Sequence, residues 1–191
     1  MKKTTLVILL LLTLVSSNAY AQDQMHEISF FAGTGSLQDI AESFGDIFPT
    51  IITMGYIREE TEMVTPVLGL NYRYHLNKVV SVGATFNYQQ FENKFNLLDR
   101  SLFTTDTRYY TFMGRVDFTY LRRRIFQMYS GVGLGISHQN ESGEDVESYN
   151  KTHFAYQANL VGLRLGKEVA GFLELGFGCN GIVAAGIAYQ F

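Results

Sequence analysis

The sequence predicts an all-β protein, folded as a closed, up-and-down antiparallel barrel of about eight strands that crosses a membrane. Three observations lead to this prediction. Apolar and polar residues alternate with a period of two in about eight segments. Phe and Tyr number 15 and 12, alongside 18 Gly and only 2 Pro, which is typical of a sheet with an aromatic surface. An export signal precedes the first of these segments.

The export signal has the layout of a cleaved signal peptide. Two lysines form a positive start, residues 6–15 are apolar, and residues 19–21 form a small-x-small cleavage motif. The apolar run is too short to span a membrane as a helix. We therefore expect cleavage between Ala21 and Gln22, which leaves a signal peptide at residues 1–21 and one barrel domain at residues 22–191.

Charge and cysteine content exclude several classes of protein. Removal of two lysines takes the 15 basic residues to 13 against 18 acidic ones, a net charge of −5. A nucleic-acid partner would need a basic face, so we expect none. Cys179 is the only cysteine, so the fold contains no internal disulfide.

The alternation is clearest in four segments, namely residues 68–76, 79–89, 108–121 and 126–137. It is weaker in residues 26–35, 154–165, 172–177 and 183–191. Phe31 interrupts the polar face of the first weak segment. The phase slips at Val161, where a β-bulge would account for it.

The alternation also predicts which face each side chain takes. Strands of about ten residues match the length of a tilted transmembrane strand. In hydrocarbon every backbone N–H and C=O group must be paired, and a closed sheet pairs them all. Bulky Leu, Val, Phe and Tyr residues are therefore expected to face lipid, and Gly, Ser, Thr, Asn and Gln to fill the lumen.

The connections alternate in length. Long connections are expected at residues 36–62, 92–107 and 139–152, and a short fourth one at residues 178–181. Tight turns are expected at residues 77–78, 122–124 and 166–168. Long outer loops opposite short periplasmic turns are typical of outer-membrane barrels.

The first long loop contains the signature of a short helix. Ser36 is a candidate N-cap, with Asp39 three residues further on. The apolar face of this helix would contain Leu37, Ile40, Ala41, Phe44, Ile47 and Phe48. A lid over the barrel mouth and an exposed docking surface both remain open for it.

The signal peptide, the eight alternating segments and the ending Gly186-Ile187-Ala188-Tyr189-Gln190-Phe191 resemble the small OmpA/OmpX/OmpW-like outer-membrane β-barrel proteins. The resemblance covers nearly all of the mature chain. It implies a bacterial outer membrane as location, with lipid and lipopolysaccharide as surroundings. It also implies that Phe191, Tyr189, Ile187 and Gly186 form an assembly signal read by the barrel-assembly machinery.

Five charged residues fall on the expected lumen face: Glu27, Arg73, Arg115, Asp117 and Glu174, with His75 near a strand end. Buried charges are costly unless they are paired, so we expect a network across the lumen. A packed polar core and a narrow ion path gated by shifting Arg–carboxylate pairs are both open interpretations.

We expect no catalytic, metal or cofactor site. His138, Glu141 and Ser142 lie close together in sequence, with His153 across the third loop. They lack the His-x-Ser spacing of the outer-membrane lipid deacylases. The leading hypothesis is a non-enzymatic barrel with a structural or surface-interaction role. A narrow porin and a lipid-modifying barrel enzyme are alternatives, and a soluble ligand-binding barrel would require an apolar lumen.

Overall fold

The computed structural model describes residues 25–39, 57–97, 100–143 and 146–191, with the backbone alone at 57–63, 93–97, 100–104, 143 and 146–149. Eight strands account for most of this length: β1 (His26–Thr34), β2 (Ile57–His75), β3 (Val80–Leu97), β4 (Arg100–Arg122), β5 (Phe126–Gly143), β6 (Val146–Gly166), β7 (Val169–Gly178) and β8 (Val183–Gln190).

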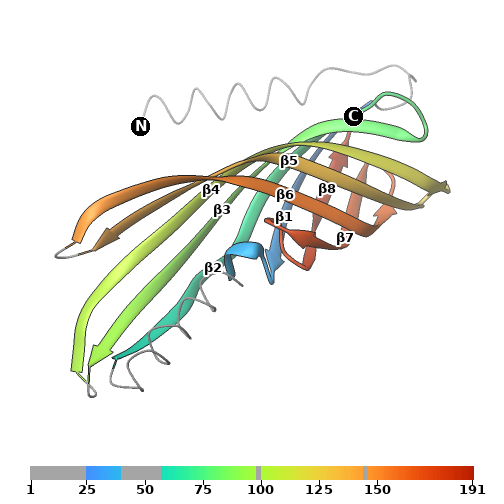
Figure 1. The fold of residues 1–191 in the computed structure, drawn as a ribbon. Coiled ribbons are helices and arrows are strands. Elements are labelled where there is room, and N and C mark those ends of the chain that lie inside the picture. Colours follow the sequence, from blue (N-terminus) through green and yellow to red (C-terminus); the bar gives the residue numbers. More distant parts are fainter. Residues whose placement is uncertain (1–24, 40–56, 98–99, 144–145) are drawn as a thin grey trace, which may run out of the picture.

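The strands close into one antiparallel barrel (Figure 1). Each strand pairs with the next in sequence, and β1 pairs with both β2 and β8. The predicted fold class is confirmed. Closure leaves no open sheet edge where all eight strands run together, so the backbone groups there are paired within the sheet.

The barrel wall is uneven in height. Strands β2 to β6 have 18 to 23 residues, whereas β1, β7 and β8 have 8 to 10. The long strands project well beyond the short ones at one end of the barrel (Figure 1). At the opposite end lie the three tight turns and the last residue, Phe191.

The prediction of loops at residues 92–107 and 139–152 was wrong. β3 and β4 stay paired out to Leu97 and Arg100, and β5 and β6 out to Gly143 and Val146. β2 likewise begins at Ile57, inside the predicted first loop. Apolar alternation reports the lipid around a strand rather than the strand itself, so it disappears where paired strands leave the apolar layer.

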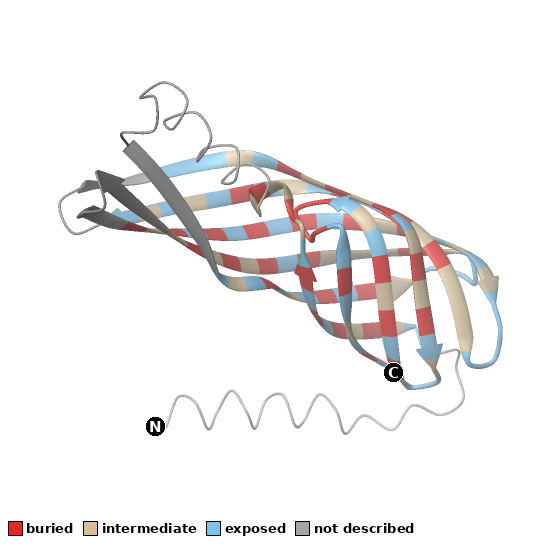
Figure 2. Ribbon diagram, turned by 90° about the horizontal axis from the view of Figure 1, so that it is seen from below, coloured by how far each residue is buried: buried red, intermediate tan, exposed pale blue. Residues whose placement is uncertain are grey.

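The two faces of the barrel have the predicted chemistry. Buried and exposed residues alternate along the parts of the strands whose side chains are described (Figure 2). Phe112 and Ile136 point outward and are exposed, while Thr111 and Ser137, next to them in sequence, are buried in the lumen. An apolar exterior around a polar interior fits a membrane barrel and excludes the soluble ligand-binding barrel.

The predicted bulge in β6 is present. Leu160 and Val161 together oppose the single residue Ser130 of β5, and the register with β7 shifts at the same place. Ser130 Oγ donates a hydrogen bond of 2.6 Å to the Leu160 carbonyl. Because of the extra residue, Asn159 and Arg164 both face the lumen although five positions separate them.

Phe31 breaks the polar lumen face because it belongs to a small apolar cluster. It packs with Val67, Phe172, Ala184 and Ala188. Its ring lies over the backbone of Gly69, where an added Cβ would come within 2.1 Å of the ring. Glycine at position 69 therefore provides the space that this aromatic side chain occupies.

The predicted N-cap at Ser36 is confirmed. Ser36 Oγ accepts a 3.1 Å hydrogen bond from the Asp39 amide, and the Ser36 amide donates one of 2.6 Å to Asp39 Oδ2. This reciprocal pair begins a helical turn at Leu37. The rest of the predicted helix, residues 40–48, lies outside the described residues. Within the described ranges, no helix has the length and apolar character needed to cross a membrane.

Candidate functional site

The lumen contains a charge cluster centred on Arg115. Its guanidinium group holds Asp117 in a bidentate pair, with Nε at 2.9 Å and Nη2 at 2.7 Å from the two carboxylate oxygens. The same Nη2 atom lies 2.9 Å from Glu174 Oε1. Paired N–H donors on one carboxylate give both energy and a defined orientation.

A second cluster surrounds Glu27. Its two carboxylate oxygens are shared between Arg73 and Arg164, and Arg164 Nε lies 2.7 Å from Oε2. Arg73 Nη1 also lies 3.9 Å from Asp117 Oδ2, which joins this cluster to the first. The structure thus brings the five predicted lumen charges into one network. His75 lies beside it at the end of β2, with Nδ1 2.6 Å from Ser81 Oγ.

Three members of the network were missing from the predicted set. Tyr129 Oη donates to Glu174 Oε1 at 2.7 Å, and Asn159 Nδ2 donates to Glu174 Oε2 at 2.8 Å. Arg73 also lies over the Tyr129 ring, 4.8 Å from its centroid. Arg164 is the third, and its position between Leu163 and Leu165 already indicated a lumen-facing side chain.

The composition of the network explains why it is tolerated in the lumen. Three arginines face three carboxylates, and each of these side chains is at most 4% exposed. Unpaired buried charges would be far more costly than the paired set. Glycine makes room for one large member, since an added Cβ at Gly162 would come within 2.4 Å of the Tyr129 ring.

The end of the lumen opposite the three tight turns is filled by the turn between β7 and β8. Asn180 is buried there. Its backbone amide donates a hydrogen bond to Gln157 Oε1 and its side-chain Oδ1 accepts one from Asn87 Nδ2, both at 2.8 Å. Cys179 is buried beside it, and this burial raises the pKa of its thiol. The turn therefore folds into the barrel and is held by side chains of the wall.

The start of the helix fills the same end of the lumen. Ser36 Oγ donates a 2.8 Å hydrogen bond to Gln89 Oε1, and Gln89 Nε2 donates one of 2.5 Å to Asp39 Oδ1. Leu37 packs against Met113, Ala155 and Cys179. Two chain segments thus enter the mouth of the barrel and are hydrogen-bonded to its inner wall.

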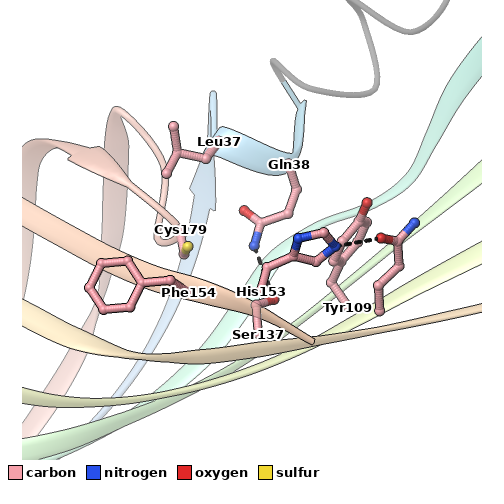
Figure 3. Close-up of a pocket in the computed structure, with 8 residues that line it drawn as sticks. Leu37, Gln38, Tyr109, Ser137, His153, Phe154 and Cys179 are labelled. Atoms are coloured by element: carbon pink, nitrogen blue, oxygen red, sulfur yellow. Dashed lines mark hydrogen bonds between the residues drawn. The ribbon is translucent and has the colours of Figure 1, made fainter. Parts of the chain in front are cut away.

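A cavity of about 350 Å³ lies between these segments and strands β4 to β6 (Figure 3). Its lining consists of Leu37, Gln38, Tyr109, Ser137, Gln139, His153, Phe154 and Cys179. His153 Nε2 lies 3.0 Å from Gln139 Oε1, and Gln38 Nε2 donates a 3.4 Å bond to Ser137 Oγ. Among the described residues, the lining contains no carboxylate to orient the imidazole as a general base.

The histidine and serine residues that were considered for catalysis do not converge. His138 is exposed on the outer face, where Nδ1 lies 3.1 Å from Thr152 Oγ1. Ser142 is exposed on that same side, and Glu141 points to the opposite face of the strand because adjacent side chains alternate. Only His153 of this set lines the cavity.

The predicted assembly residues lie at the seam between β1 and β8. The Phe191 ring stacks on His26 at 5.6 Å and on Tyr189 at 5.7 Å. Ile187 and Tyr189 are exposed on the outer face, and Gly186 faces Phe172 inside. Their role in assembly remains a prediction. The expected cleavage site at Ala21 and Gln22 lies outside the described residues.

This geometry defines a class of protein: a small transmembrane β-barrel with an apolar exterior and a filled polar lumen. The profile of the outer membrane protein beta-barrel domain family matches residues 7–180. The chain belongs to that family and is an outer-membrane β-barrel protein with transmembrane strands.

Two solved structures are similar to this chain. The N-terminal β-barrel domain of Pseudomonas aeruginosa OprF is 10% identical, with a TM-score of 0.50, over 88% of this chain and 98% of that chain. The attachment invasion locus protein Ail of Yersinia pestis, in complex with the heparin analogue sucrose octasulfate, is 18% identical, with a TM-score of 0.45, over 87% and 99%. At these identities the likeness concerns the fold alone. The search of curated proteins finds no match.

Proposed function

We propose that this protein is a non-enzymatic outer-membrane barrel that anchors a projecting β-sheet for contact with partners outside the cell. The observation that carries the proposal is the difference in height between β2–β6 and the other three strands. The filled lumen also supports an anchoring role. Charged side chains fill one part of it, and two chain segments fill its mouth.

The height of the membrane band follows from β4. Tyr110 and Tyr120 are exposed ten residues apart on its outer face. At about 3.3 Å per residue and a tilt of about 40°, they span about 25 Å, which is the height of the apolar band of such barrels. β4 continues from Tyr110 to Arg100, so nearly half of the strand extends beyond this band.

The outer face of the strands changes character beyond this limit. Tyr88 and Tyr110 lie ring against ring at 5.3 Å and mark the boundary. Farther along β4 toward the projecting end, the next residues on the outer face are the exposed Arg108 and the half-buried Asp106. Asp106 accepts a 3.5 Å hydrogen bond from Gln90. Polar side chains on the outer face indicate water or lipopolysaccharide sugar rather than hydrocarbon.

Shortening the projecting hairpins tests the proposal. One variant replaces residues 93–105 with a two-residue Asn-Gly turn, and a second replaces residues 141–149 in the same way. Each cut ends at a paired position, Glu92 with Asp106 or Asn140 with Asn150, so the register below it is kept. We expect both variants to insert as heat-modifiable barrels.

Cell attachment provides the readout. Cells expressing the full chain should aggregate and attach to mucin-coated or polystyrene surfaces more strongly than cells expressing equal amounts of the shortened barrels. Equal attachment by the full-length and both shortened forms would overturn the proposed surface role.

A narrow pore is a second candidate, favoured by one observation. Arg73 Nε and Arg115 Nη1 are buried donors without a partner among the described residues. Such donors normally bind water, which would make the network part of a hydrated path. Planar-bilayer conductance of the wild type, Arg73→Ala and Arg115→Ala tests this candidate, and near-zero conductance in all three would eliminate it.

A further inference from the structure

The three tight turns share a pattern that neither the anchor nor the projecting sheet explains. Each turn carries exposed basic residues, and these are Lys78, Arg122, Arg123, Arg124 and Lys167, which we name the basic rim. Each turn also carries apolar residues that are more than half exposed, and these are Leu76, Val79, Ile125, Leu165 and Val169. Charged and apolar side chains thus alternate around one end of the barrel.

Backbone hydrogen bonds join the turns into a continuous arc. The Thr119 amide of β4 donates to the Val79 carbonyl at 2.7 Å, which links the first turn to the strand leading into the second. The Gly166 amide donates to the Ile125 carbonyl at 2.9 Å, which links the second turn to the third. The basic rim is therefore one surface that spans the side of the barrel from β2 to β7.

The cations of this arc are available to an outside partner. The ion pairs between described residues lie in the lumen, among Glu27, Arg73, Arg115, Asp117, Arg164 and Glu174. Glu168 is the one acidic residue within the described turns. Five cations against one carboxylate create a positive local potential, although the whole chain has a net charge of −3.

We propose that the basic rim binds the phosphate groups of anionic phospholipids in the leaflet that surrounds the short-turn end. This inference does not depend on the proposed surface role. Arginine matches a phosphate with paired N–H donors, and lysine supplies a flexible point charge. In barrels of this class the short turns face the periplasm, so the inner leaflet of the outer membrane would supply these lipids.

The apolar neighbours favour a lipid over a soluble anionic polymer. Leu76 and Val79 flank Lys78, Ile125 follows the three arginines, and Leu165 and Val169 flank Lys167. Exposed apolar side chains at these positions hold the turns at the edge of the hydrocarbon. The adjacent basic side chains then extend to the depth of the headgroup phosphates.

The absence of tryptophan in this chain permits a site-specific test. Ile125→Trp places a single fluorophore beside the three arginines, and Phe154→Trp places a control toward the other end of the barrel. Each protein is reconstituted in phosphatidylcholine vesicles that contain a minor fraction of phosphatidylglycerol. In one sample the phosphatidylcholine is brominated as the quencher, and in the other the phosphatidylglycerol is. Quenching then measures which lipid is enriched at each tryptophan.

We expect quenching at position 125 to show phosphatidylglycerol enriched about fivefold or more over its bulk fraction, as expected for even one basic residue at an anionic surface. The control at position 154 should show no enrichment. Changing Arg122, Arg123 and Arg124 together to Gln should lower the enrichment at position 125 severalfold, with Lys78 and Lys167 left in place, whereas the triple change to Lys should retain more of it. Heat-modifiable gel mobility verifies that each variant is folded.

Two results would overturn the proposal. One is a lipid ratio at position 125 equal to the bulk ratio. The other is an enrichment that the triple Gln change leaves undiminished. If the lipid ratio at position 125 equals the bulk ratio but the triple Gln variant loses binding to isolated cell wall, the basic rim binds an anionic polymer instead. The lipid proposal then fails.

Discussion

Arg164 Nε donates a 2.7 Å hydrogen bond to Glu27 Oε2, although 137 positions separate the two residues in the chain. The contact joins β6 to β1 across the lumen. Arg164 also donates to the Lys167 carbonyl at 2.7 Å, so its position is fixed by the turn that follows β6. One side chain thus connects a tight turn to the strand at which the barrel closes.

Removal of the shared carboxylate should be strongly destabilising. Glu27→Gln leaves Arg73 and Arg164 without their common anion, and loss of one partner in a buried ion pair typically costs about 3–5 kcal/mol. We expect the free energy of unfolding in detergent micelles, measured by urea titration, to fall by about that amount. Glu168→Gln, at an exposed position in a tight turn, is the control and should change it by less than about 0.5 kcal/mol. An equal effect of both changes would contradict the role assigned to the network.

A methyl group at position 69 should clash with Phe31. Gly69→Ala places a Cβ within 2.1 Å of the Phe31 ring, and overpacking of this kind costs about 1–3 kcal/mol. Gly171→Ala is the matched control, because an added Cβ there meets nothing within 4 Å. Unfolding titrations should show a loss of stability for the first variant only. In a Phe31→Ala background, where the ring is absent, Gly69→Ala should cause a smaller loss than it does in the wild type. Equal stability of the Gly69 and Gly171 variants would refute the close contact.

The single cysteine should be unreactive in the folded barrel. Cys179 is 3% exposed and burial raises its pKa, so at neutral pH the reactive thiolate is both scarce and shielded. Maleimide labelling should be at least about 100-fold slower than that of Ser142→Cys in a Cys179→Ser background. Labelling in denaturant should bring the two rates together. Fast labelling of the native protein would show that the turn at the barrel mouth opens.

The terminal aromatic residue should matter more for assembly than for stability. Phe191 stacks on His26 and Tyr189, and such aromatic pairs contribute about 0.5–1.5 kcal/mol each. Phe191→Ala should therefore lower the unfolding free energy modestly while strongly reducing the amount inserted in cells, and Phe191→Tyr should retain both.

Tyr120→Ala removes an exposed aromatic residue near the same end of the barrel and is the control. It should leave the inserted amount close to the wild-type level. If the inserted amount falls equally in the Phe191→Ala and Tyr120→Ala variants, residue 191 has no special role in assembly.

Much of the fold follows from residue order alone. Period-two alternation located the strands between residues 68 and 137, and the phase slip at Val161 located the bulge that the structure places at Leu160 and Val161. The spacing of Ser36 and Asp39 located the helix cap. These features depend on neighbours within a few positions, so the sequence contains the necessary information.

The sequence did not predict the strand segments that extend beyond the membrane band, and the reason is physical. Beyond Tyr88 and Tyr110, paired strands are no longer surrounded by hydrocarbon, and their outer faces become polar. A polar strand with polar neighbours has no alternation and resembles a loop in sequence. Only the cross-strand register, such as Asn93 opposite Thr105, reveals that pairing continues.

The sequence by itself determined the class of fold, the closure of the sheet, and which side chains face lipid or lumen, because lipid imposes these choices on every short stretch of strand. The tertiary structure alone decided which lumen charges meet, and it added Arg164, Tyr129 and Asn159 to the network. It also placed the turn at Cys179 and the helix start at Ser36 inside the mouth. Apart from the Arg115–Asp117 pair, these contacts join residues 15 or more positions apart, and their geometry depends on the shear and closure of the whole barrel.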